Sequence, residues 1–118
     1  MHTTPNVHGC EPCSIVVTVE PSVVTLRVSG ELDHAAWPSV EQALMSCLVV
    51  GCEGIVLDLA DVSFVSLSSC EQLHRAIGTL RAARRHVVVE LSRTVMHTMR
   101  LVVSLGALPA SAVALLDG

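Results

Sequence analysis

The sequence predicts an α/β domain built on a mixed sheet, with an N-terminal antiparallel hairpin, then parallel strands, and helices packed mainly on one face. Residues 14–20 and 23–29 are alternating, branched runs separated by a Pro-Ser turn, which is typical of a hairpin. Two later branched runs, 55–59 and 86–91, alternate with stretches of helical periodicity, which indicates parallel strands joined by right-handed crossovers. The 118 residues suffice for one domain with a single core.

The first 13 residues, which include Pro5, Gly9 and Pro12, show no hydrophobic periodicity. We therefore expect residues 1–13 to form a flexible tail and residues 14–118 to form the domain.

Cys10 and Cys13 form a C-x-x-C motif in that tail, with His2 and His8 nearby. Thiolates and imidazoles are zinc ligands, but this spacing is common, so we interpret the cysteines as incidental and predict no metal site. The chain contains five cysteines, and this odd number argues against a disulfide framework.

The segment after the hairpin predicts a turn followed by an amphipathic helix. Gly30 is expected to end the strand, and Glu31 and Asp33 to lie in the next loop, with Asp33 capping the helix. The helix begins near Pro38, which a first helical turn tolerates, and ends at Gly51. Its apolar residues recur with helical spacing on one face: Val40, Ala43, Leu44, Cys47 and Leu48.

The chain is organised around residues 55–71. The nearly continuous apolar run at 55–59 predicts a central strand that is buried on both faces and is followed by a polar loop. Ser68 and Glu71 have the spacing of an S-x-x-E capping box, which predicts that Ser68 caps a second helix over about 69–84.

Three hydroxyls, those of Ser66, Ser68 and Ser69, therefore lie together where this second helix begins. The first turn of a helix has unpaired N–H groups and the positive end of the helix dipole, so it favours an anion. A phosphate esterified to one of these serines would be such an anion.

The last third of the chain predicts another buried strand and a third helix. Residues 86–91 form the strand, and Ser92 or Thr94 caps a helix that continues to about Leu105 and stops at Gly106. Residues 112–116 are expected to form a short strand or a helical turn.

Composition excludes several classes of function. The formal charge is -4 and the pI is near 5.8, so the chain lacks the basic surface that nucleic-acid binding requires. No apolar run reaches the length of a membrane span and no signal peptide is evident, which predicts a cytoplasmic protein. All charged residues from 31 to 71 are acidic, which favours a basic partner.

The chemistry of an enzyme is not recognisable in this sequence. It contains no nucleophile and base at a known spacing, and neither of the glycine-rich motifs that bind nucleotides. We therefore predict a binding protein that is not an enzyme and has no cofactor.

Two motifs resemble the STAS domain of bacterial anti-sigma-factor antagonists. The first is the turn Gly-Glu-Leu-Asp at 30–33, and the second is the stretch VLDLADVSFVSLSS at 56–69. Members of that family have Asp-Ser-Ser-Gly where this chain has Ser-Leu-Ser-Ser at 66–69. The acidic residue and the glycine are thus missing, while Ser68 keeps the position of the phosphorylated serine.

The resemblance implies an anti-sigma-factor antagonist. Such a protein binds an anti-sigma factor with a histidine-kinase-like ATPase fold and thereby frees a sigma factor. The kinase phosphorylates the serine, here Ser68, and a PP2C-type phosphatase restores it. The residues expected to frame the contact are Glu31, Asp33, Asp61, Ser66, Ser69 and Glu71.

Other readings of the sequence remain open at this point. The chain could be a degenerate STAS module that is not phosphorylated and that responds to redox state or to a ligand. Its Ser68 would then serve only as a helix cap. The oligomeric state is also open, and a homodimer is one option.

Overall fold

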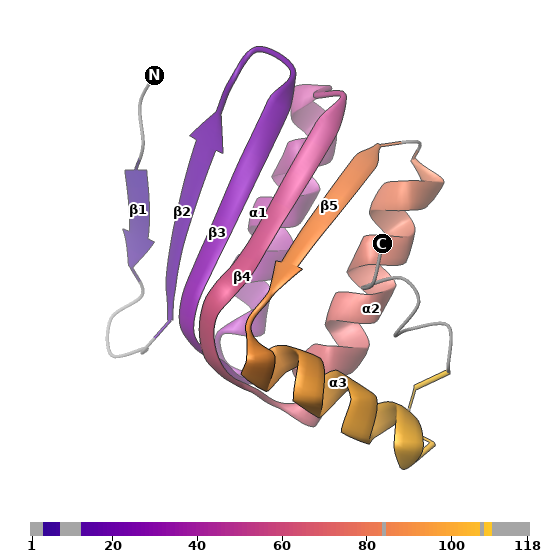
Figure 1. Cartoon of the computed structure of the whole chain (residues 1–118). Helices are drawn as coiled ribbons and strands as arrows, with labels where there is room; N and C mark the ends of the chain where they lie inside the picture. The colour runs from indigo at the N-terminus through magenta and orange to yellow at the C-terminus, as the bar shows by residue number, and fades with distance from the viewer. Residues whose placement is uncertain (1–3, 8–12, 84, 107, 110–118) are drawn as a thin grey trace.

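The computed structural model describes residues 4–7, 13–83, 85–106 and 108–109. It has a five-stranded sheet in the order β1-β2-β3-β4-β5, and the helices lie behind the sheet and across its lower end (Figure 1). The elements are β1 (Thr4–Val7), β2 (Ser14–Val19), β3 (Val23–Leu32), α1 (Trp37–Val50), β4 (Gly54–Val65), α2 (Leu67–Ala82), β5 (His86–Leu91) and α3 (Arg93–Ser104).

The mixed character of the sheet is confirmed. β2 pairs with β3 in antiparallel fashion, and β3, β4 and β5 are parallel neighbours. The first strand differs from expectation, because residues 4–7 lie in the predicted tail and yet pair with β2 as an antiparallel edge strand. An edge strand is held by backbone hydrogen bonds, so it does not need the alternating apolar pattern on which our prediction depended.

β3 and β4 are both longer than predicted. Gly30 does not end β3 but lies within it, with a φ of 93° beside an irregularity in the β3–β4 register. This left-handed backbone conformation is one that glycine adopts without strain. The pairing continues to Leu32 opposite Val65, so the predicted polar loop is strand except for Ser66.

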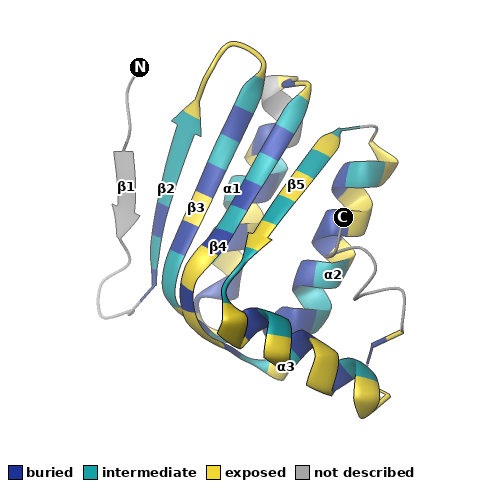
Figure 2. Ribbon diagram, viewed as in Figure 1, coloured by how far each residue is buried: buried dark blue, intermediate teal, exposed yellow. Residues whose placement is uncertain are grey.

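The described helices cover only one face of the sheet, which corrects the prediction that the central strand is buried on both faces. Ile55, Leu57 and Leu59 of β4 are buried, whereas Val56 and Asp58 between them are partly exposed (Figure 2). β5 is likewise an edge strand with alternating exposure and is not a buried one. A branched run marks a strand but does not show whether helices cover its second face.

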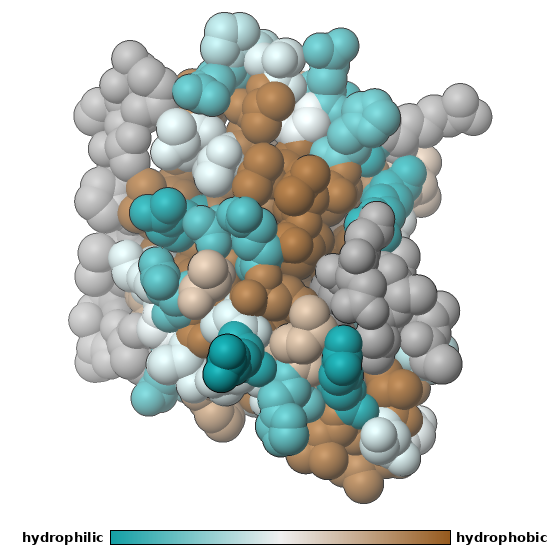
Figure 3. Space-filling view, in the orientation of Figure 1, coloured by the Kyte–Doolittle hydropathy of each residue, from teal (hydrophilic) through white to brown (hydrophobic). Residues whose placement is uncertain are grey.

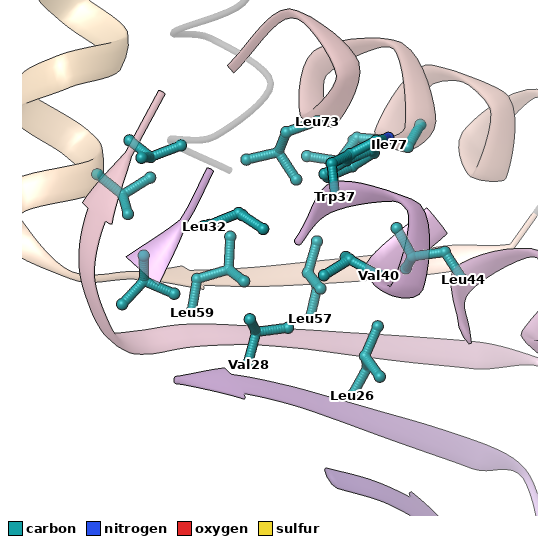
Figure 4. Close-up of a cluster of buried hydrophobic side chains, with 14 of the residues drawn as sticks. Leu26, Val28, Leu32, Trp37, Val40, Leu44, Leu57, Leu59, Leu73 and Ile77 are labelled. Carbon is teal, nitrogen blue, oxygen red and sulfur yellow. The ribbon is translucent and has the colours of Figure 1, made fainter. Parts of the chain in front are cut away.

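The core lies between the covered face and the helices. Leu26 and Leu57 of the sheet, Val40 of α1 and Ile77 of α2 belong to one buried apolar cluster, in which Trp37 lies beside Ile77 (Figure 4). A core of this kind supplies most of the favourable free energy of folding.

The ends of α1 and α3 confirm the predicted signals. Pro38 lies in the first turn of α1, and Gly51 follows the helix with a φ of 77°. Ser92 caps α3, because its Oγ accepts a hydrogen bond from the Val95 N–H at 3.2 Å. Residues 112–116 lie outside the described part of the chain. No described helix combines the length and the apolar character needed to cross a membrane.

Two core cysteines are protonated in neutral solution. Burial, together with the neighbouring Cys52, raises the pKa of the Cys47 thiol to about 11. Burial, followed by the nearby Glu71 carboxylate, raises the pKa of Cys70 to about 11. Their thiolates are therefore disfavoured in the folded state.

These thiols predict an alkaline loss of stability. The raised folded-state pKa values stabilise the fold below an unfolded thiol pKa of about 8.5, and this stabilisation disappears as the pH rises through about 11. The chain contains no lysine or tyrosine, so few other groups titrate there. The free energy of unfolding, followed by Trp37 fluorescence in urea, should fall by on the order of 1 kcal/mol per thiol per pH unit. Cys70→Val should flatten this fall, and an unchanged slope would contradict the assignment.

Candidate partner-binding site at the start of α2

The site lies where the carboxyl ends of β3 and β4 meet the first turns of α2 and α3, at the lower end of the sheet in Figure 1. Two hydrogen bonds connect these segments. The Ser66 N–H donates to the Leu32 carbonyl at 3.1 Å, and the Ser92 hydroxyl donates to the Val62 carbonyl at 2.7 Å. The start of each helix is thus attached to the end of a strand.

Ser66, and not Ser68, is the N-cap of α2. Ser66 has extended backbone angles, and its Oγ accepts a hydrogen bond from the Ser69 N–H at 3.1 Å. Because β4 runs to Val65, the helix starts earlier than predicted, and Glu71 lies beyond its first turn. The predicted capping box of Ser68 with Glu71 is therefore wrong, and so is the interpretation of Ser68 as the cap.

Ser69 faces the interior and does not belong to the exposed surface. Its exposed fraction is 0%, and its Oγ accepts a hydrogen bond from the Ser66 hydroxyl at 2.9 Å. The expectation that Ser69 contacts a partner is corrected, because at this helical position its side chain points into the core.

Ser68 is the second residue of α2 and is partly exposed. Its Oγ lies 3.3 Å from the Ser66 Oγ. The N–H groups of Leu67 and Ser68 open the helix and have no partner within it. A negative group on the Ser68 oxygen would therefore lie close to these donors and to the positive end of the helix dipole.

The acidic residues at this end differ in their availability. Glu31 and Asp61 are exposed and lie on β3 and β4, while Glu71 is partly exposed on α2. The Asp33 Oδ1 accepts a hydrogen bond from the Ala36 N–H at 2.9 Å in the turn that leads into α1. The N-cap of α1 is Ala36 and has no side-chain cap, so the prediction that Asp33 caps this helix is wrong. A partner can reach Glu31 and Asp61 without breaking a local hydrogen bond.

Two apolar side chains beside the serines were missed by the sequence analysis. Phe64 is 48% exposed and Leu67 is 53% exposed, and they flank Ser66 at the end of β4 and the start of α2. The exposure of Phe64 could have been inferred from the sequence. Side chains alternate between the two faces of a strand, so Val62, Phe64 and Val65 cannot all face the core. Exposed aromatic and aliphatic side chains within a polar rim are typical of protein-binding surfaces.

Within the described residues, no three His, Cys, Asp or Glu side chains are grouped so that they could hold a metal ion. Cys10 of the C-x-x-C motif lies outside the described residues.

A profile of the STAS domain matches residues 14–105, and the chain belongs to this family. No curated protein sequence matches the chain. Among solved structures, it is similar to an anti-sigma factor antagonist from Mycobacterium paratuberculosis, with a TM-score of 0.66 and 19% identity over 95% of this chain and all of that one.

The chain is also similar to the anti-sigma factor antagonist SpoIIAA in its unphosphorylated form, with a TM-score of 0.58 and 23% identity over 78% of this chain and 83% of that one. A further match is to a protein called Mglu, with a TM-score of 0.60 and 26% identity over 65% of this chain. The chain spans only 19% of the length of Mglu. These likenesses establish the fold.

The capping geometry makes a prediction about stability. Ser66→Ala removes the acceptor for the Ser69 N–H and should lower the free energy of unfolding by about 0.5–2 kcal/mol. Ser66→Asp should be nearly neutral, because aspartate is an equally good cap. The matched control is Ser68→Ala, which leaves the cap intact and should change the melting temperature little. A larger loss for Ser68→Ala than for Ser66→Ala would contradict the assignment.

Proposed function

We propose that this protein is an anti-sigma-factor antagonist, a cytoplasmic regulator that binds an anti-sigma factor with a histidine-kinase-like ATPase fold and so frees a sigma factor. The observation that carries the proposal is a partly exposed serine at the start of α2 of a STAS domain, with exposed Phe64, Leu67, Glu31 and Asp61 on β3, β4 and the first turn of α2. The two apolar side chains form the centre of the contact, and the carboxylates attract a basic partner.

Phosphorylation of Ser68 would switch this contact. A phosphoserine carries a charge of about -2 and would lie beside the two exposed apolar side chains, so it would disrupt a complementary interface. A PP2C-type phosphatase would restore binding. The serines that depart from the family motif are compatible with this switch, because Ser66 caps without a charge and Ser69 is turned inward.

The net effect of charge on the phosphorylated state is small. The dipole and N–H groups of α2 attract the phosphate by about 0.3–1 kcal/mol, while the partly exposed Glu71 opposes it. Phosphorylation would therefore act by blocking the partner and would not refold the helix. The alternative is a STAS module that binds without phosphorylation, and the departures at positions 66 and 69 favour it.

Variants of Ser68 separate these two functions. If Ser68 is the phosphoacceptor, Ser68→Asp should weaken binding at least about tenfold, or about 1.4 kcal/mol, while Ser68→Ala binds but is not labelled by the kinase. Both variants should melt near wild type, because Ser66 remains the cap. Titration calorimetry and radiolabelling measure these outcomes. Retained binding by Ser68→Asp, with no labelling of wild type, would favour the unphosphorylated module.

The acidic residues predict an effect on association rate. Replacing Glu31 and Asp61 by lysine should lower the rate constant for association about tenfold and weaken its dependence on salt. The matched control is Glu20→Lys with Glu53→Lys, an equal charge change on exposed residues at the opposite ends of β3 and β4. Equal effects of the two double variants in stopped-flow measurements would show that only net charge matters.

A further inference from the structure

Within the described residues, β5 is an unprotected edge of the sheet. It is the last strand in the sheet order, and all six of its residues pair with β4 without a register shift. Edge strands are usually protected by proline, lysine or a bulge, because their free backbone groups can pair with another chain. The sequence of β5, HVVVEL, contains neither proline nor lysine.

The backbone directions of β5 follow from its two ends. The His86 N–H donates to the Glu53 carbonyl at 3.1 Å, and the Ser92 N–H donates to the Leu59 carbonyl at 3.2 Å. Since N–H and C=O directions alternate along a strand, the even-numbered residues bond to β4. The backbone groups of Val87 and Val89 therefore point away from the sheet.

We propose that β5 pairs in antiparallel fashion with β5 of a second copy, about a two-fold axis at Val88, to form a homodimer with a continuous sheet. Val87 then exchanges both backbone hydrogen bonds with Val89 of the partner subunit, and the two-fold axis repeats this exchange. Val88 lies opposite Val88 of the partner subunit as a non-hydrogen-bonded pair, in which side chains approach closely.

This register is self-complementary in charge. It places the exposed His86 opposite Glu90 of the partner subunit, where an imidazole N–H can donate to the carboxylate. A hydrogen-bond donor beside Glu90 is favourable, because within its own sheet Glu90 is aligned with another carboxylate, that of Asp58. The Asp58 carboxylate is itself bonded to Arg27 at 3.2 Å. The imidazole of the partner subunit thus adds a hydrogen-bond donor beside the two neighbouring carboxylates of Asp58 and Glu90.

The register also buries apolar surface on both faces. Val88 is 55% exposed, and the surface over β4 and β5 is largely apolar (Figure 3). On the helix side, Val87, Val89 and Leu91 pack against the core but remain only partly buried. Pairing places Val87 against Val89 of the partner subunit, which covers part of this exposed edge.

Other positions of the axis are less favourable. An axis at Val87 places His86 opposite Val88 of the partner subunit, and an axis at Val89 places Glu90 opposite Val88 of the partner subunit. In both cases a polar side chain faces an apolar one. An axis at Glu90 brings two carboxylates together, and like charges directly opposite each other are destabilising. The axis at Val88 pairs the imidazole of His86 with the carboxylate of Glu90, and it pairs the valines with each other.

The first test uses Val88→Cys. A two-fold axis at this residue brings the two introduced sulfurs within reach of a disulfide, so mild oxidation should give a covalent dimer on a non-reducing gel. The matched control is Val19→Cys, at a similarly exposed valine on β2. Wild type and Val19→Cys should remain mostly uncrosslinked. Crosslinking of Val19→Cys to the same extent would overturn the assigned register.

The second test is sedimentation equilibrium of the full chain without any partner. Wild type should show a monomer–dimer equilibrium, and Val88→Lys should raise the dimer dissociation constant by about tenfold or more, unlike Val19→Lys. A wild type that is monomeric at all concentrations overturns the proposal. So does a dimer that forms only in a chain truncated after Pro109, because the C-terminal segment would then occupy the edge. Circular dichroism checks that Val88→Lys folds. If Val88→Lys does not fold, the crosslinking of Val88→Cys still tests the proposed register.

Discussion

The pairing of β3 with β4 up to Leu32 and Val65 is the constraint on which the rest of this structure depends. It holds the two central strands together beyond the irregularity at Gly30, and it leaves Ser66 as the single residue between β4 and α2. The Ser66 N–H then bonds to the end of β3, and its hydroxyl caps the helix. One residue therefore determines where the sheet ends and where α2 begins.

This geometry separates the three serines into different roles. Ser66 forms the cap, Ser69 is buried and bonded to it, and Ser68 is left at the surface. An acidic cap, as the family usually has, would place a negative charge near Ser68, whereas the serine found here does not. The departure from the family motif thus preserves the fold of the helix start and changes its electrostatics.

The one-sided arrangement of the helices has a second consequence. It buries one face of the sheet, and in the part of the chain that the structure describes nothing covers the other face or the edge of β5. The partner-binding end and the open edge are built from different residues: Phe64 and Leu67 on one side, Val88 on the other. Because the two surfaces share none of these residues, dimerisation and partner binding can be measured independently.

The sequence by itself determined the mixed sheet, the strand at 86–91, the amphipathic α1 and a cap of α3 at Ser92 or Thr94, because local periodicity and capping residues specify these features. It also placed Ser68 near the start of a helix. Only the tertiary structure decided that β4 continues to Val65, that Ser66 is the cap and that Ser69 is buried. The physical reason is that strand length and helix start depend on hydrogen bonds between β3 and β4, which are distant in the sequence. In the same way, the exposure of Phe64 and the open edge of β5 depend on which helices cover the sheet, and no local pattern specifies that.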